Sequence, residues 1–299
     1  MNTSDITKLA TERRNPRSRD IDRLTTAEMV SLINSEDKKV ADAVEKVCPQ
    51  IAAAVDLIYA RMKRGGRLIY CGCGTSGRLG ILDASECPPT YSVPAETVQA
   101  VIAGGKGAVF NAVEGAEDSA ELGKEDMLKL ALAENDTLVG IAASGRTPYV
   151  LGAMKAARDA GAGVIGLTCC PGSEIERAAD IGISPDPEPE VITGSTRMKC
   201  GTAQKMVLNM LSTCTMIKLG KVYGNLMVDV KPSNEKLVHR CISIVREATG
   251  ADEKTAVAAL EECGYKCKTA IVMLLCSVSA GEAEARLSRS GGRVADAIR

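Results

Sequence analysis

Tryptophan is absent from this chain of 299 residues, and phenylalanine and histidine each occur once. Aromatic residues make up only 2% of the sequence, too few for a nucleobase-stacking platform or for an aromatic sugar-binding surface. Positive charge is not in excess either, because 37 Lys and Arg balance 38 Asp and Glu to a net charge of −1. We therefore expect no nucleic-acid partner and no binding to an anionic membrane.

Long hydrophobic runs and an apolar leader are also missing. The longest apolar run covers residues 270–276, which is far too short to cross a bilayer. The first 22 residues mix Arg with Asp and Glu, unlike a signal or transit peptide. Twelve cysteines form no C-x-x-C pair, and their density is below that of small secreted domains. These features predict a cytoplasmic protein with reduced thiols.

Metal ligands are scarce in this sequence. His239 is the only histidine, and it falls in a helical tail where we expect a structural role. The cysteine spacings offer no set of four ligands of the kind that holds zinc. We therefore predict no metal site and no metal or redox cofactor.

Short apolar segments alternate with helical patterns through the middle of the chain. Near-continuous apolar strands separated by helices are typical of a parallel sheet that is covered on both faces. The predicted fold class is thus α/β, a three-layer α/β/α sandwich with a mainly parallel sheet. The segments are residues 67–73, 97–102, 137–143, 164–168, 181–184 and 191–192.

The two ends of the chain have different patterns. Residues 1–24 predict an extended charged arm, followed by a helix from Thr26 and a second helix over 37–64 that is broken or kinked near Pro49. A further helix is expected over 202–219, and helix-forming segments beyond residue 230 predict a small C-terminal helical bundle. We expect three parts: N-terminal arm and helices 1–54, central domain 55–222 and helical domain 223–299.

Three loops that follow apolar segments are rich in glycine and hydroxyl groups. The first, residues 72–78 (GCGTSGR), matches G-x-G-x-x-G, but no acidic residue stands where a dinucleotide ribose would need one. Hydroxyls and backbone N–H groups at a helix N-terminus suit a compact phosphate monoester better. The second and third loops are residues 143–148 and 193–199.

These loops would meet at one edge of a parallel sheet. Each loop taken alone is better explained as an ordinary helix cap, since Ser and Thr are common caps. All three together, each next to an arginine (Arg78, Arg146 or Arg197), favour a phosphate-centred site. The predicted phosphate ligands are Thr75, Ser76, Ser144, Ser195 and Thr196.

Carboxylates are the remaining acid–base candidates. Glu86 precedes Pro88 and Pro89, which predicts a stiff turn just after a helix. Glu114 and Glu117 lie in a second acidic segment, and composition alone does not separate them. A solvated acidic helix start explains that segment as well.

Several long motifs in this sequence are specific enough to compare with known families. They are residues 11–22, 72–91 (GCGTSGRLGILDASECPPTY), 112–119 (AVEGAEDS), 140–150, 193–205 (TGSTRMKCGTAQK) and 224–230. These motifs resemble the N-acetylmuramic acid 6-phosphate etherase family, whose central part is a sugar isomerase (SIS) domain, and the likeness extends over nearly the whole chain. The resemblance implies cleavage of the D-lactyl ether of the phosphosugar in bacterial cell-wall recycling, without a cofactor.

The resemblance also implies roles for two glutamates. Glu86 matches the family's proton donor, and Glu117 matches its second active-site glutamate. A carboxylate that takes a proton from carbon needs burial to raise its pKa, so we expect a partly desolvated Glu117 and a protonatable Glu86. The resemblance further implies a homodimer with the site near the subunit interface.

Two other functions fit the same loops. An aldose–ketose phosphosugar isomerase would share the phosphate site but would not need the acid at Glu86. A non-catalytic phosphosugar-binding regulator, as in the related glucokinase regulatory protein, would need neither glutamate. Metal-dependent hydrolysis is disfavoured because ligands are scarce. Whether Arg13, Arg14 and Arg17 touch substrate is left open by the sequence.

Overall fold

The computed structural model describes residues 10–111, 113–230, 232 and 234–299. They fall into two compact units, each built from two stretches of the chain. The first unit lies within Met1–Ala84 and Glu96–Ser212, and the second within Ser85–Ala95 and Thr213–Arg299.

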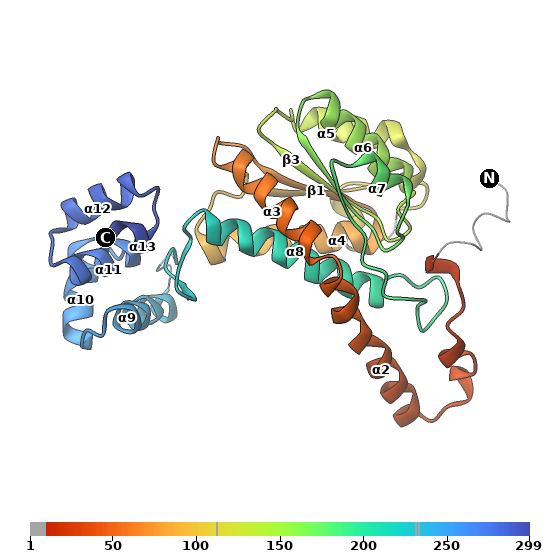
Figure 1. The fold of residues 1–299 in the computed structure, drawn as a ribbon, viewed down its shortest axis with the longest axis horizontal. Coiled ribbons are helices and arrows are strands. Elements are labelled where there is room, and N and C mark those ends of the chain that lie inside the picture. Colours follow the sequence, from red (N-terminus) through yellow and green to blue (C-terminus); the bar gives the residue numbers. More distant parts are fainter. Residues whose placement is uncertain (1–9, 112, 231, 233) are drawn as a thin grey trace. The chain divides into compact units, whose positions relative to one another are not determined.

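A five-stranded parallel sheet forms the centre of the first unit (Figure 1). The spatial order of its strands is β2-β1-β3-β4-β5. Every residue of β1, β3 and β4 is buried, as expected for central strands covered on both faces. The strands are β1 (Leu68–Gly72), β2 (Val98–Ile102), β3 (Thr137–Ile141), β4 (Gly163–Leu167) and β5 (Ile181–Ile183).

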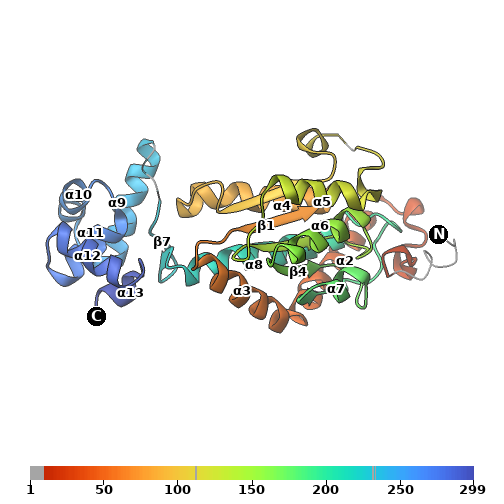
Figure 2. The same ribbon diagram turned by 90° about the horizontal axis from the view of Figure 1, so that it is seen from above.

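Helices cover both faces of this sheet, which confirms the predicted three-layer α/β fold. On one face, α5 (Ala120–Lys129), α6 (Pro148–Asp159) and α7 (Glu174–Ala178) share a buried core with the strands. The helices α5 and α6 lie side by side in both views (Figure 2). The other face carries α3 (Cys48–Met62) and the first parts of α4 (Gly74–Tyr91) and α8 (Lys199–Lys218).

A buried polar contact links this second layer to the sheet. The hydroxyl of Tyr70 on β1 donates to Asp83 on α4 at 2.8 Å, and Ser212 on α8 donates to the same carboxylate at 3.1 Å. Burial raises the pKa of Asp83, although both hydrogen bonds act against that shift. The contact fixes α4 and α8 against β1.

The second unit is helical, as the sequence predicts. Its core joins the helices to the residues that follow a two-stranded antiparallel hairpin. The elements are β6 (Val222–Tyr223), β7 (Leu226–Met227), α9 (Glu235–Thr249), α10 (Glu253–Glu262), α11 (Cys267–Cys276), α12 (Ala280–Arg289) and α13 (Val294–Ala297). None of the helices described for the chain is long and apolar enough to span a membrane.

The N-terminal segment differs from the sequence prediction. Instead of an extended arm, residues 10–23 form three 3₁₀ turns: η1 (Ala10–Glu12), η2 (Pro16–Ser18) and η3 (Ile21–Arg23). The rest of the predicted arm lies outside the described residues. The two following helices are α2 (Thr26–Glu45) and α3, and Pro49 stands in the first turn of α3, where a missing N–H costs nothing.

Two further local predictions are wrong. Residues 191–192 form no strand, and α4 continues through Pro88 and Pro89 to Tyr91. Glu86 therefore lies inside a helix and not on a turn. Both prolines lie in the last turns of α4, where the φ that their rings fix is compatible with a helix although two amide donors are lost.

Candidate functional site

The order of the strands places a crevice between β1 and β3. The chain moves from β1 to β2 on one side and then returns to β3 on the other. Ligands of open α/β sheets bind at such a reversal, beyond the carboxyl ends of the strands. Two of the three loops that the sequence singled out follow β1 and β3.

The loop after β1 brings the N-terminus of α4 close to the strands. A Cβ on Gly77 would lie 2.6 Å from Ile102 Cγ1, and one on Gly72 would lie 2.8 Å from the amide nitrogen of Gly77. Gly74 has a φ of +50°, which favours glycine. Because the amides of Thr75 and Ser76 lie in the first turn of α4, the loop presents N–H donors to an anion.

A cavity of about 230 Å³ opens at this crevice, entirely within the first unit. It brings together four of the five predicted phosphate ligands (Thr75, Ser76, Ser144 and Thr196) and one predicted glutamate, Glu117. Ser195 and Glu86 are not among its lining residues. The full lining is Thr11, Glu12, Cys73, Gly74, Thr75, Ser76, Glu117, Ile141, Ala142, Ala143, Ser144, Thr147, Gly194 and Thr196.

The third loop is closed by a buried carboxylate that the sequence analysis missed. Glu190 is completely buried, and it accepts hydrogen bonds from the backbone N–H groups of Lys199 at 3.0 Å and Cys200 at 2.9 Å. A carboxylate at a helix N-terminus is stabilised by the helix dipole. Glu190 thus joins the start of the loop to the start of α8, and the residues between them include Gly194 and Thr196 of the cavity wall.

The hydroxyl groups that line the cavity differ in whether they can donate a hydrogen bond to a ligand. Ser76 donates its hydroxyl hydrogen to Gln204 Oε1 at 2.9 Å, so that hydroxyl faces a ligand mainly as an acceptor. The backbone N–H groups of α4 and the hydroxyls of Thr75, Ser144 and Thr196 are the remaining donors of the three loops.

The sequence suggested that arginines beside the three loops would contribute to the site, but the described residues line the cavity without them. None of the described lining residues is Arg or Lys. The Arg78 guanidinium donates to the carbonyl oxygens of Val109 at 2.7 Å and Ala108 at 2.9 Å, and so anchors the segment after β2. A phosphate in this cavity would depend on N–H and O–H donors and on the α4 dipole.

Cys73 in the cavity wall is a neutral thiol. Burial raises the pKa of Cys73 to about 12, and the negative charges of Glu117 and Asp118 act in the same direction. A thiolate nucleophile is therefore disfavoured at neutral pH. Glu117 remains as the acid–base group of the predicted set in this cavity.

The two predicted glutamates lie in different units. Glu117 belongs to the 3₁₀ turn η5 (Ala116–Asp118) and lines the cavity with an exposed side chain, so the expected desolvation is absent in the single chain. Glu86 is an exposed residue of α4 in the second unit. Glu114, which composition could not separate from Glu117, does not line the cavity.

Sequence reasoning missed Thr11 and Glu12. Both belong to or adjoin the turn η1 and line the cavity, next to the loop that contains Gly194. Their position in a motif of the resembling family was the only available signal. Within the described part of the chain, no group of three or more His, Cys, Asp or Glu residues is arranged to hold a metal ion.

Two family models match parts of this chain. Residues 50–158 match the glucokinase regulatory protein N-terminal SIS domain, and residues 112–213 match the SIS domain. The solved phosphoheptose isomerase from Francisella tularensis matches with a TM-score of 0.50 and 20% identity, over 65% of this chain and 100% of that chain. That likeness concerns the fold.

Full-length relatives are much more similar. The N-acetylmuramic acid 6-phosphate etherase of Clostridium beijerinckii is 54% identical over 100% of this chain and 98% of its own length. The etherase of Edwardsiella ictaluri is 57% identical over 98% of both chains. With the SIS-type fold and the cavity at its switch point, these relatives show that the chain belongs to the N-acetylmuramic acid 6-phosphate etherase family.

Proposed function

We propose that this chain cleaves the D-lactyl ether of N-acetylmuramic acid 6-phosphate and releases N-acetylglucosamine 6-phosphate and D-lactate. The observation that carries the proposal is the 54–57% identity to named etherases over nearly the whole chain. A hydroxyl-lined cavity at a helix N-terminus supports it, because such a site suits a sugar phosphate.

The proposed reaction is an elimination followed by addition of water. In the open-chain aldehyde, a base removes the proton from carbon 2, a double bond forms between carbons 2 and 3, and the bond from carbon 3 to the lactyl oxygen breaks. The leaving oxygen takes a proton from an acid. Water then adds its hydroxyl to carbon 3 and a proton returns to carbon 2, so one water is consumed in total.

We assign the base to Glu117 and the acid to Glu86. The position of Glu117 supports its assignment as the base, because it lines the cavity together with the predicted phosphate ligands. The neutral thiol of Cys73 leaves this carboxylate as the stronger base beside the loop after β1. Glu86 rests on its match to the family's proton donor. Thr75, Ser144 and Thr196 are proposed to bind the phosphate through their hydroxyls, and Ser76 through its backbone N–H in the first turn of α4. Ser195 is proposed to support the third loop.

The test is D-lactate release in water labelled with oxygen-18. We expect one labelled oxygen at carbon 3 of N-acetylglucosamine 6-phosphate and none in D-lactate, since water attacks the sugar carbon. Label in D-lactate would contradict the elimination, because it requires attack on the lactyl carbon. Tight binding of the substrate without lactate release would instead identify a phosphosugar-binding regulator, and conversion of an aldose phosphate to a ketose phosphate would identify an isomerase.

We further propose a homodimer. The first unit exposes several large apolar side chains that a monomer would leave in water, including Phe110 at 86%, Val30 at 61% and Ile192 at 50% exposed. Phe110 and Val113 lie close in sequence to Glu117, so an interface there would also desolvate the carboxylate. This fits the burial that a carbon-acid base requires.

Analytical ultracentrifugation tests the dimer. We expect a species of twice the 31.4 kDa chain mass, and we expect Phe110→Ser to weaken its association about tenfold or more, as loss of an aromatic anchor does. Leu275→Ser, in the second unit, is the control and should leave association unchanged. A monomeric wild-type protein at micromolar concentration would reject the proposal.

A cytoplasmic location is proposed on the chemistry of the thiols. All twelve cysteines are free in the structure, and eight of them are buried. Proteins of oxidising compartments more often pair their cysteines.

A further inference from the structure

The N-terminal arm supplies part of the cavity wall. Thr11 and Glu12 line the same cavity as Thr75, Ser144 and Glu117, although more than 60 residues separate them in sequence. Glu12 is half-buried, and a Cβ added to Gly194 would lie 3.2 Å from its Oε2 atom. The carboxylate therefore reaches across to the third loop.

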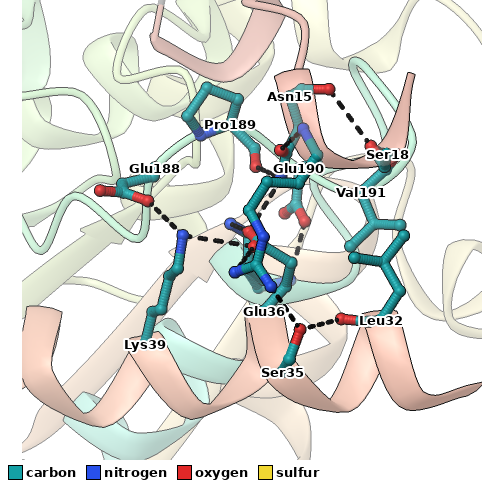
Figure 3. Close-up of polar contacts among 12 residues, drawn as sticks. Asn15, Ser18, Leu32, Ser35, Glu36, Lys39, Glu188, Pro189, Glu190 and Val191 are labelled. Carbon is teal, nitrogen blue, oxygen red and sulfur yellow. Dashed lines mark hydrogen bonds and ion pairs between the residues drawn. The ribbon is translucent and has the colours of Figure 1, made fainter.

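Buried contacts hold the arm in this position. Asn15 donates to Glu36 Oε2 at 2.8 Å and to the carbonyl oxygen of Pro189 at 3.1 Å (Figure 3). Ser18 donates to the carbonyl oxygen of Val191 at 2.6 Å. The bonds to Pro189 and Val191 are made by buried side chains and reach the segment between β5 and α8 that leads into the third loop. The arm and the third loop are thus fixed to each other a few residues from Glu12.

Among the residues that the structure describes, Thr11 and Glu12 have no hydrogen-bonding partner for their side chains. Thr11 is 3% exposed, and its Oγ1 has no hydrogen-bond partner among the described residues. A buried hydroxyl without a partner is costly, so such groups usually meet a ligand or water. Glu12 likewise forms no hydrogen bond or ion pair with the residues described here.

The charge of Glu12 decides which part of a ligand it can meet. A carboxylate accepts hydrogen bonds and repels a phosphate dianion or a second carboxylate. Most of the N–H and O–H donors proposed for the phosphate, at the N-terminus of α4 and at Ser144, lie on loops other than the one that Glu12 reaches. Glu12 therefore suits the neutral donors of a sugar, which are its hydroxyl and amide N–H groups.

We infer that Glu12, with Thr11, hydrogen-bonds the hydroxyl or amide N–H groups of the bound phosphosugar, so that the N-terminal arm is part of the substrate site. The identity of the sugar rests on the proposed function. Charge-assisted hydrogen bonds between a carboxylate and a neutral donor are stronger than neutral ones. This assigns the arm a role in selecting the sugar and leaves phosphate binding to the three loops.

Calorimetric titration with two probes tests the inference. N-acetylglucosamine 6-phosphate should bind Glu12→Ala about 10- to 100-fold more weakly than wild type, with a smaller loss for Thr11→Val. Inorganic phosphate should bind Glu12→Ala as well as wild type or better, because a negative charge has been removed. Asp22→Asn, an exposed carboxylate of the same arm, should change neither affinity.

Two results would overturn the inference. One is an unchanged affinity of Glu12→Ala for N-acetylglucosamine 6-phosphate. The other is an equal loss for both probes, which would mean that the substitution only displaces the arm. Glu12→Gln keeps the shape of the side chain and provides the same comparison should Glu12→Ala fail to fold.

The proposed function is tested separately by the wild-type protein. A wild type that releases no D-lactate rejects the etherase activity whatever Glu12 does. The comparison between wild type and Glu12→Ala can then be repeated with glucose 6-phosphate, which shares the phosphate and the ring hydroxyls. A selective loss of glucose 6-phosphate binding over inorganic phosphate would support contact of Glu12 with the sugar hydroxyls. Unchanged affinities for both glucose 6-phosphate and N-acetylglucosamine 6-phosphate would refute the role of Glu12.

Discussion

Replacing Glu117 by glutamine is expected to slow D-lactate release about 10²- to 10⁴-fold, the range over which general base catalysis acts. The amide keeps the size and the hydrogen-bonding shape of the side chain but cannot accept the proton from carbon 2. Binding of N-acetylglucosamine 6-phosphate should change little, because the phosphate ligands lie on other loops. The measurement is the rate constant kcat for D-lactate release with wild type and variant at saturating substrate.

Glu114→Gln is the matched control for this experiment. Glu114 is an exposed glutamate of the same acidic segment, three residues away, and it does not line the cavity. Its substitution should leave kcat within about twofold of wild type, as surface changes usually do. An equal effect of both substitutions would show that the charge of the segment matters and that Glu117 has no special role.

Deuterium exchange separates the roles of the two glutamates. In heavy water, Glu86→Gln should still exchange the carbon 2 proton of the substrate while it releases D-lactate slowly, since the base is intact and the acid is missing. Glu117→Gln should lose both exchange and release. Exchange that survives in Glu117→Gln and disappears in Glu86→Gln would reverse the assignment.

The loops after β1 and β3 could be predicted because each is encoded by a short continuous stretch of sequence. Apolar segments followed by glycine and hydroxyl residues located the strands and the loops after β1 and β3, because a parallel strand, its tight turn and its helix cap are contiguous in sequence. Thr75 and Ser144 then line one cavity because β1 and β3 are neighbouring parallel strands whose carboxyl ends lie at the same edge of the sheet.

The remaining part depends on contacts that are distant in sequence. Thr11 and Glu12 reach the cavity through Asn15 and Ser18, whose partners lie more than 170 residues away at Pro189 and Val191. No periodicity in residues 1–24 encodes that docking. Arg78 illustrates the opposite error, because this arginine follows a phosphate-type loop and yet binds backbone carbonyl oxygens of the segment after β2.

Glu36 is expected to be among the most sensitive residues for stability. Its carboxylate pairs with Lys199 Nζ at 3.0 Å, and both side chains are fully buried. It also accepts from Arg17 at 2.8 Å and from Lys39 at 3.2 Å on its other oxygen, and these contacts join α2, η2 and α8 (Figure 3). Although burial opposes it, the hydrogen bonds and charges of Lys199, Asn15 and Lys39 lower the pKa of Glu36 to about 2.

Replacing Glu36 by leucine should lower the free energy of unfolding by about 3–5 kcal/mol, because the ammonium group of Lys199 is left buried without its partner. Circular dichroism in urea measures this loss, since the chain has no tryptophan to report by fluorescence. Glu188→Gln is the control: its bond to Lys39 is solvent-exposed, and its removal should cost less than about 1 kcal/mol.

The dependence of stability on pH is an independent measure of the Glu36–Lys199 pair. The lowered pKa of Glu36 means that its stabilising effect is complete above the ordinary value of 4.5 and is lost as the pH falls towards about 2. Wild type should therefore lose stability over that interval more steeply than Glu36→Leu.

Adding Lys199→Met to Glu36→Leu should restore much of the lost free energy of unfolding at pH 7, because it removes the unpaired buried charge. If the double variant is no more stable than Glu36→Leu, the pair holds α2 to α8 through the shape of its side chains, and the electrostatic explanation is wrong.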